Sequence, residues 1–400
     1  MLLAASAMAA LLAGCGGTAQ GGGSHQASSS SQKGSSQQTT EPTTNETSVG
    51  RCADNANATV EQREPSGGEV SNGKIAFVRT NADATCADIY VMDEEGTHET
   101  RLTRTPQEEE SPVWSPDRKK IAFSRNRNVY VMDADGSGQD YLTDGSSPEW
   151  SPDGRKLAFI TKRTGLSVMN ADGTNLTQLQ TKPSTNPDEM YETTPSYGSP
   201  VWSPTGNKLA FGRYTERLRS DYSGGMVSRG PIEGLTGMYM INVDGTGLRK
   251  LTGSHEKEGS GGYGMTPAWS PDGGKIAFND NGMVNVINPD GSGRKELPGT
   301  KGAGYVPVWS PDSQKIAYFD STYSGLYVIN ADGSGREKLT GVASGLPQHA
   351  WSPDGQKLAF FCPGYGGDAS LCAINADGTE RARLARAISP SGYGVYAAWG

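Results

Sequence analysis

The side chains best suited to catalysis are few and widely spaced in this sequence. It contains four histidines, His25, His98, His255 and His349, and no two of them have the spacing of a metal-binding pair. His255 and His349 are the two that we expect on the same side of the fold, where they could be the remnant of a metal or lyase site. No Gly-x-Ser-x-Gly nucleophile motif is present. We therefore expect a protein without catalytic residues, cofactor or metal.

Asp-x-Asp-Gly segments such as 133–136 recur along the chain and resemble the start of a calcium-binding loop. A calcium loop needs further oxygen ligands and ends in Glu, and none of these segments continues in that way. Asp, Asn and Gly are also the residues that tight hairpin turns require. We interpret the segments as turns.

Tyrosine and arginine are the side chains that point most clearly to recognition. Tyr197, Tyr263, Tyr305 and Tyr393 each lie beside Gly, four to six residues before a tryptophan. Tyrosine is a rigid side chain with an apolar body and a polar tip, which suits binding surfaces. Loop packing against a neighbouring element is the alternative role. Arg213 begins a long insertion of mixed charge that runs to about residue 237, and we expect that insertion to be solvated.

These residues are set within one segment that recurs along the chain, Trp-Ser-Pro-Asp-Gly-x-Lys-Ile/Leu-Ala-Phe. The Lys-Ile/Leu-Ala-Phe/Tyr part occurs seven times, and each copy is followed by a second apolar segment, an Asp-Gly turn and a short third segment. Each unit thus has four short runs rich in Val, Ile, Tyr and Phe, which is typical of strands. The copies of the motif begin at Lys74, Lys120, Lys156, Lys208, Lys275, Lys315 and Lys357.

Four antiparallel strands in a unit of about 40 residues predict one β-propeller blade. We letter the strands a to d: strand a holds Pro-x-Trp, strand b Lys-Ile-Ala-Phe, strand c the second apolar segment and strand d Leu-Thr. The chain enters the first unit at strand b, and residues 396–399 supply the missing strand a. The prediction is an all-β, seven-bladed propeller over 73–400, closed by a C-terminal strand that joins the first blade.

The repeat resembles that of the TolB-type (WD-like) propellers, which reads Trp-Ser-Pro-Asp-Gly-Lys-Lys-Ile-Ala-Phe, and the resemblance covers residues 73–400. It implies that strand a is innermost. This chain departs from the family in two ways: TolB propellers commonly have six blades, and residues 51–72 are too few for the α/β domain that precedes the propeller in TolB. A role in the Tol machinery is not implied.

The two faces of such a propeller differ here. Every a–b and c–d connection is a short turn, whereas the b–c and d–a connections on the opposite face vary widely, with long insertions around blade 4. Long loops in compact domains are usually functional, although neutral insertions are the alternative. We expect the four tyrosines, Arg213, His255 and His349 to lie on this loop-rich face, with the tyrosines around the mouth of the central channel.

The N-terminus reads as an export signal. Residues 2–13 are almost entirely Leu, Ala and Met, which is the length of a signal-peptide apolar region. Residues 12–15, Leu-Ala-Gly-Cys, resemble the bacterial lipobox, and this resemblance implies a signal over 1–15 with lipid attached to Cys15. An ordinary signal with an incidental cysteine is the alternative, and no Lys or Arg precedes the apolar run. Residues 16–50, rich in Gly, Ser, Thr and Gln, are expected to form a disordered tether.

The other four cysteines are expected to form disulfides, because an exported protein meets an oxidising environment. Cys362 ends strand b of the last blade and Cys372 lies in the neighbouring strand c, close enough to bond. The two remaining cysteines, Cys52 and Cys86, are then expected to bond to each other, which would join the extension 51–72 to the first blade. Four buried thiols are the alternative.

Composition limits the choice of function. The net charge of −8 argues against a nucleic-acid binder. We expect a monomeric, lipid-anchored protein on the exported side of a bacterial envelope, which binds a protein or peptide through its loop-rich face. A glycan-binding protein or polysaccharide lyase that uses the same funnel is the alternative, and the scarcity of histidine favours the first hypothesis.

Overall fold

The fold is that of a computed structural model. It describes residues 73–399, apart from 81–85, 162–164, 180–195, 215, 221–225, 232–235, 254–265, 281, 304–306, 321–324, 342–347, 364–368 and 389–396. Within these residues, no helix has the length and apolar character needed to cross a membrane.

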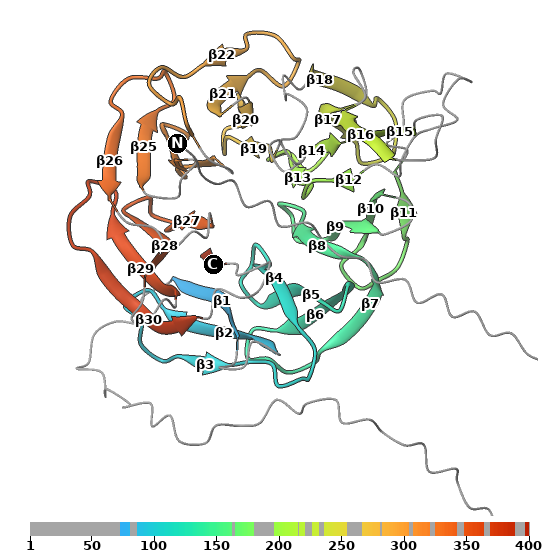
Figure 1. The fold of residues 1–400 in the computed structure, drawn as a ribbon. Helices are drawn as coiled ribbons and strands as arrows, with labels where there is room; N and C mark the ends of the chain where they lie inside the picture. The colour runs from blue at the N-terminus through green and yellow to red at the C-terminus, as the bar shows by residue number, and fades with distance from the viewer. Residues whose placement is uncertain are drawn as a thin grey trace, which may run out of the picture. The chain divides into compact units, whose positions relative to one another are not determined.

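Seven antiparallel sheets of the described residues lie around a common centre and are the seven predicted blades; an eighth sheet is a two-stranded hairpin (Figure 1). In the order a to d, blade 1 is β31 (Ala397–Trp399), β1 (Lys74–Thr80), β2 (Ala87–Asp93) and β3 (Thr100–Arg101). Blade 2 is β4 (Glu109–Trp114), β5 (Lys120–Arg125), β6 (Asn128–Asp133) and β7 (Asp140–Asp144). Blade 3 is β8 (Ser146–Trp150), β9 (Lys156–Thr161), β10 (Gly165–Asn170) and β11 (Thr177–Gln178).

Blade 4 has a divided inner strand, β12 (Ser196–Tyr197) and β13 (Val201–Trp202), followed by β14 (Lys208–Tyr214), β17 (Gly237–Asn242) and β18 (Arg249–Gly253). Blade 5 is β19 (Ala268–Trp269), β20 (Ile276–Asp280), β21 (Met283–Ile287) and β22 (Lys295–Glu296). Blade 6 is β23 (Val308–Trp309), β24 (Lys315–Phe319), β25 (Leu326–Asn330) and β26 (Glu337–Thr340). Blade 7 is β27 (His349–Trp351), β28 (Lys357–Pro363), β29 (Ala369–Asn375) and β30 (Ala382–Ile388).

The ring closes within blade 1, as the repeat predicts. Strand β31 pairs antiparallel with β1, with Ile75 opposite Trp399 and Phe77 opposite Ala397. The inner strands contact one another in succession, β31 with β4, β4 with β8, and so on through β13, β19, β23 and β27 back to β31. The first and last strands of the described chain thus belong to one sheet (Figure 1).

The core lies between the blades. Phe77, Phe123 and Phe159 of the recurring motif are fully buried. Side chains alternate along a strand, so each blade contributes one face to the cluster on either side of it. Val129 of blade 2, for example, belongs to the same buried cluster as Phe159 of blade 3. Burial of apolar surface at these interfaces is the main favourable term that holds the ring together.

The recurring tryptophan has a second role besides apolar burial. In four blades its indole Nε1 donates a hydrogen bond to the backbone carbonyl of the residue that precedes the tryptophan of the previous blade. The bonds are Trp150 to Val113 (3.2 Å), Trp202 to Glu149 (3.0 Å), Trp309 to Ala268 (3.0 Å) and Trp351 to Val308 (3.2 Å). They join successive inner strands directly.

The recurring Ser-Pro-Asp-Gly segment forms a turn that is held by hydrogen bonds between its own residues. Ser151 Oγ donates to Asp153 Oδ1 at 2.6 Å and accepts from the Lys156 backbone N–H at 2.9 Å. Gly154 has φ +69°, which glycine adopts without strain. In the c–d turns, Asp172 accepts in the same way from the backbone N–H and the hydroxyl of Thr174. These carboxylates are therefore used within their own turns.

The predicted disulfide of blade 7 is confirmed. Cys362 and Cys372 are bonded, with their Cα atoms 5.9 Å apart. They are diagonal rather than directly opposite, since Cys372 faces Phe360 and Cys362 faces Ser370. Cys86 is also disulfide-bonded. Its expected partner, Cys52, lies outside the described residues.

The insertion of blade 4 differs from the expected loop. Strand b does not end at Gly212, because β14 continues through Tyr214 and pairs with β12. Beyond it, β15 (Glu216–Ser220) and β16 (Met226–Pro231) pair as a hairpin. The extra length of β14 carries Arg213 into the sheet.

Candidate functional site

Three of the predicted recognition residues lie in the described part of the chain: Tyr197, Arg213 and His349. His349 begins β27, is buried, and packs edge-on against Phe319 of blade 6 at a ring-centroid distance of 5.2 Å. The other predicted residues lie outside the described residues; they are Tyr263, Tyr305, Tyr393, His255, Cys15 and Cys52.

Tyr197 and Arg213 are brought together, directly opposite each other in the pairing of β12 with β14. The half-buried Tyr197 ring lies 6.2 Å from the Phe211 ring. It also packs on Gly165 of blade 3, where a Cβ atom would approach the ring to 2.7 Å. Tyr197 is thus part of the interface between blades 3 and 4, at the loop-rich end of β14.

Arg213 is a buried cation whose charge no described carboxylate matches, contrary to the expectation of a solvated side chain. It is 2% exposed, and its guanidinium carbon lies 5.9 Å from the centre of the Tyr239 ring, whose hydroxyl it also hydrogen-bonds. Its Nε and Nη1 atoms have no hydrogen-bond partner. Within the described ranges, no carboxylate forms an ion pair with Arg213.

A second cation lies on the same tyrosine. Lys250 Nζ is 6.0 Å from the centre of the Tyr239 ring. Burial, and then the charge of Arg213, lower the pKa of Lys250. Two positive groups therefore share one partly desolvated position at the interface of blades 3 and 4, which favours the approach of an anion.

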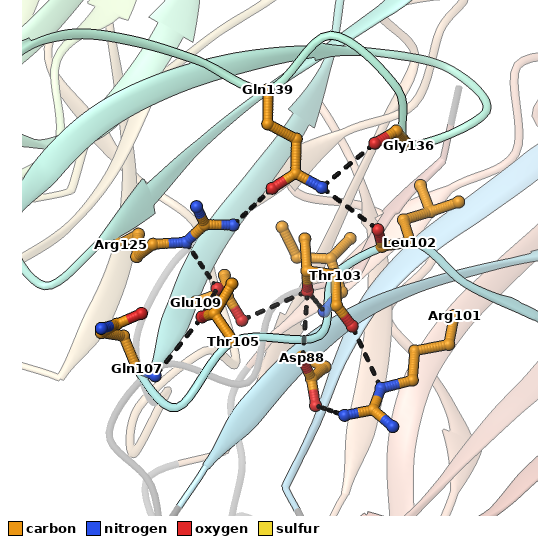
Figure 2. Close-up of polar contacts among 11 residues, drawn as sticks. Asp88, Arg101, Leu102, Thr103, Thr105, Gln107, Glu109, Arg125, Gly136 and Gln139 are labelled. Atoms are coloured by element: carbon orange, nitrogen blue, oxygen red, sulfur yellow. Dashed lines mark hydrogen bonds and ion pairs between the residues drawn. The ribbon is translucent and has the colours of Figure 1, made fainter. Parts of the chain in front are cut away.

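In blade 2, the arginine at the same repeat position, Arg125, forms an ion pair (Figure 2). Arg125 Nε donates to Glu109 Oε1 at 2.6 Å, and Nη2 donates to Gln139 Oε1 at 2.6 Å. Its guanidinium carbon lies 4.7 Å from the Tyr130 ring centre. Glu109 is fully buried, so this ion pair is a strong, desolvated one.

The network around Arg125 is balanced by further residues from blade 1 (Figure 2). Thr103 Oγ1 lies 3.2 Å from Glu109 and 3.4 Å from Asp88, and Arg101 donates to Asp88 at 2.7 Å. Thr105 donates to Glu109 at 2.6 Å. Burial raises the pKa of both Asp88 and Glu109 against the lowering effect of these partners. Two arginines face two carboxylates, so the network is neutral and holds blades 1 and 2 together.

Comparison of the two blades shows what blade 4 lacks. Glu109 and Tyr197 each lie five residues before the tryptophan of their inner strand, and both pair in register with the arginine of strand b. Gln139 and Leu248 each lie six residues after the last residue of strand c. Both acceptors of Arg125 are thus replaced in blade 4, where Arg213 occupies the equivalent position without either acceptor.

Other blades retain the pairing. In blade 1, Arg79 Nη2 donates to Glu99 at 2.9 Å while its guanidinium lies 4.6 Å from the Tyr90 ring centre. In blade 5 the carboxylate is on strand b and the arginine is beside strand d: Arg294, the residue before β22, donates to Asp280 at 2.6 Å. The sequence carries a signal for these stacks that its analysis missed, since Arg79, Arg125 and Arg213 each follow the motif lysine by five residues.

One further charged group lies on an inner strand. The residue before the tryptophan is apolar and half-buried in five blades and is Glu149 in blade 3. The five are Val113, Val201, Ala268, Val308 and Ala350. Desolvation raises the pKa of Glu149 to about 7. In the part of the chain that the structure describes, no three His, Cys, Asp or Glu side chains come together as a metal site would require.

Comparison with known proteins places this geometry in a family. The model of the TolB beta propeller domain matches residues 70–188 and 227–392. Among solved structures, TolB from Acinetobacter baumannii is 18% identical, over 83% of this chain and 67% of that one, with a TM-score of 0.48. An oligogalacturonate lyase from Vibrio parahaemolyticus is 16% identical, over 75% of this chain and 90% of that one, with a TM-score of 0.49. No curated protein matches the sequence significantly.

Proposed function

Because this chain belongs to the TolB β-propeller family, we propose that it is a non-catalytic binding module that recognises a protein or peptide through its loop-rich face. The observation that carries the proposal is Arg213, a buried guanidinium whose Nε and Nη1 atoms have no hydrogen-bond partner. Residues that leave strong donors unused in the free protein are candidates for contact with a ligand, because an unmatched buried charge is costly.

The group that Arg213 recognises is a carboxylate of the partner. A guanidinium presents a planar fork of donors that matches a carboxylate, and the pair is stronger where water is excluded. Lys250 adds a second positive charge, and Tyr239 supplies an aromatic surface between the two. In a protein partner, the carboxylate belongs to an Asp or Glu side chain or to the chain end. Because Arg213 is buried, binding requires the chain around the end of β14 to open locally.

A titration with two capped peptides tests this proposal. Wild-type protein is mixed with an Asp/Glu-rich peptide and with the same peptide carrying Asn/Gln. The Arg213→Met variant is expected to weaken binding of the acidic peptide at least about tenfold. Arg155→Met is the matched control, because Arg155 has an 85% exposed side chain, and it should bind as wild type does. Equal binding by wild type and Arg213→Met would exclude Arg213 as the anchor.

The cellular position of this module is also proposed. We place it outside the cytoplasm, with lipid on Cys15 and residues 16–50 as a tether. The Cys362–Cys372 disulfide supports this position, because disulfides persist in exported proteins and are rare in the cytosol. Cys15→Ala should move the protein from the membrane fraction to the soluble or secreted fraction. Retention of that variant in the membrane fraction would count against acylation.

A further inference from the structure

A groove opens on the face opposite the loops, between the short turns of blades 2 and 3. It has a volume of about 890 Å³. Apolar side chains of both blades line it, among them Val131 and Leu142 from blade 2 and Trp150 and Ala171 from blade 3. The groove is independent of Arg213, which lies at the loop-rich end of blade 4.

The charges that line this groove are mostly negative. Asp117, Asp140, Asp153 and Asp172 contribute carboxylates, and Lys120 is the lysine among the lining residues. The Lys120 ammonium is already paired with Asp133 at 2.8 Å. Hydrogen bonds from Ser115, Ser151 and Thr174 lower the pKa values of three of these carboxyls, those of Asp117, Asp153 and Asp172, and keep them ionised.

Exposed apolar side chains gather on the same two blades. Across the described residues, the large hydrophobic side chains that are exposed are Tyr141 of blade 2, at 54%, and Leu176 of blade 3, at 55%. Tyr141 lines the groove. Its ring is held in place, because its hydroxyl donates to Asp144 at 2.9 Å and the ring lies edge-on to Tyr130 at 5.7 Å. A fixed, exposed aromatic ring is a typical contact residue of a binding surface.

The repeat shows that the fold does not require these residues. The Asp140–Tyr141 pair of strand d corresponds to Arg249–Lys250 in blade 4 and to Lys295–Glu296 in blade 5. In blades 3 and 7 the same positions hold Thr177–Gln178 and Ala382–Arg383. An acidic residue followed by an aromatic one occurs in blade 2 alone among the seven units. The groove is therefore a local feature of one blade interface.

We propose that this groove binds an extended, basic segment of a partner protein, with an apolar side chain of the segment on the groove floor and Lys or Arg beside Tyr141 and the aspartates. Charge complementarity determines this choice, because a groove lined by four carboxylates and one lysine repels an acidic partner and attracts a basic one. A cation beside an exposed tyrosine ring gains a further attraction. The propeller then has two binding surfaces of opposite preference on opposite faces.

The test uses the purified full chain and a fluorescein-labelled, end-capped peptide, Lys-Arg-Trp-Arg-Lys, followed by anisotropy. The wild type is expected to bind this peptide, more weakly as salt rises. Any binding of the Glu-Glu-Trp-Glu-Glu counterpart belongs to the Arg213 site, so substitutions in the groove should not weaken it. Asp140→Arg combined with Tyr141→Lys gives blade 2 the residues of blade 4 and should weaken binding at least about tenfold. Both positions are exposed, so the fold should be retained, which a melting curve checks.

Blade 3 supplies the matched control. Thr177→Arg combined with Gln178→Lys introduces the same two cations at exposed, equivalent positions and should leave the affinity within about twofold of wild type. Arg213→Met should also leave it unchanged, which separates this groove from the loop-rich face. Equal affinity of the blade 2 variant and wild type would overturn the proposal. Self-association of the chain that is lost in the blade 2 variant would also overturn it, because the occupant would then be a second copy.

Discussion

Replacing Arg125 and Arg213 by methionine, one at a time, is expected to have different effects on stability although both hold the same repeat position. Arg125→Met leaves Glu109 fully buried without its cation. Removing one partner of a buried ion pair typically costs about 3–5 kcal/mol. We expect a loss in the free energy of unfolding of that order. The loss should be smaller near pH 5 than near pH 8, because a protonated Glu109 no longer needs a cation.

Arg213→Met removes a buried charge that has no counter-ion among the described residues. The variant loses a distant contact with the Tyr239 ring, at 5.9 Å, and a hydrogen bond to its hydroxyl. Such contacts contribute about 1 kcal/mol each. It also removes the desolvation penalty of an unmatched guanidinium, which is at least as large. We expect a change between zero and a gain of about 2 kcal/mol in the free energy of unfolding.

Thermal unfolding followed by tryptophan fluorescence measures both variants against wild type. One kcal/mol shifts the melting temperature of a domain of 150–250 residues by about 2–4 °C, and less for a longer chain. Arg125→Met should therefore melt at least about 5 °C below Arg213→Met. Similar losses in the free energy of unfolding of both variants would refute the reasoning. Arg213 would then have a counter-charge in the folded protein and no unused donors for a partner's carboxylate.

Deleting residues 397–400 removes β31 and opens blade 1, so we expect a lower melting temperature and aggregation through the exposed edge; an unchanged melting curve would contradict closure by this strand. The pKa of Glu149 is raised from 4.5 to about 7, so the folded protein should lose stability as the pH rises through that range. Denaturation curves at about pH 5 and about pH 8 should show this loss in wild type and not in a Glu149→Gln variant. Replacing Cys362 and Cys372 by alanine removes a disulfide that spans 10 residues and should cost about 2–3 kcal/mol in chemical unfolding. Reductant should cause at least this loss in wild type, because it also breaks the disulfide of Cys86.

The regular parts of this fold were predictable because each copy of the repeat forms the same four-stranded sheet. The seven copies of the motif predicted the number of blades. The strand at residues 396–399, which has no unit of its own, predicted where the ring closes. The positions of Cys362 and Cys372 in neighbouring strands predicted their bond. Each of these depends on local pairing that recurs. The role of the tryptophan as a donor to the previous blade was not predicted, since it involves a residue about 40 positions earlier in three of the four cases.

The site was harder to predict because it depends on departures from the repeat. Counting charges around Arg213 suggested solvation, but β14 runs two residues beyond Gly212 and places the side chain against the neighbouring blade. The turn face seemed uniform because its turns are alike, whereas the groove owes its character to Asp140 and Tyr141 in a strand. Aligning the seven units position by position reveals both features without a structure, since Tyr197 and Tyr141 differ from the residues at the same positions of the other units.

The closure of the ring inside blade 1 also has an evolutionary consequence. The two ends that must meet, β1 and β31, are both contained in one sheet, and the other six blades are complete units between them. Duplication or loss of one whole unit by recombination leaves that junction untouched. Blade number can therefore change between relatives while the way of closing the ring is inherited, and newly duplicated blades are free to diverge into sites such as the interface at Arg213.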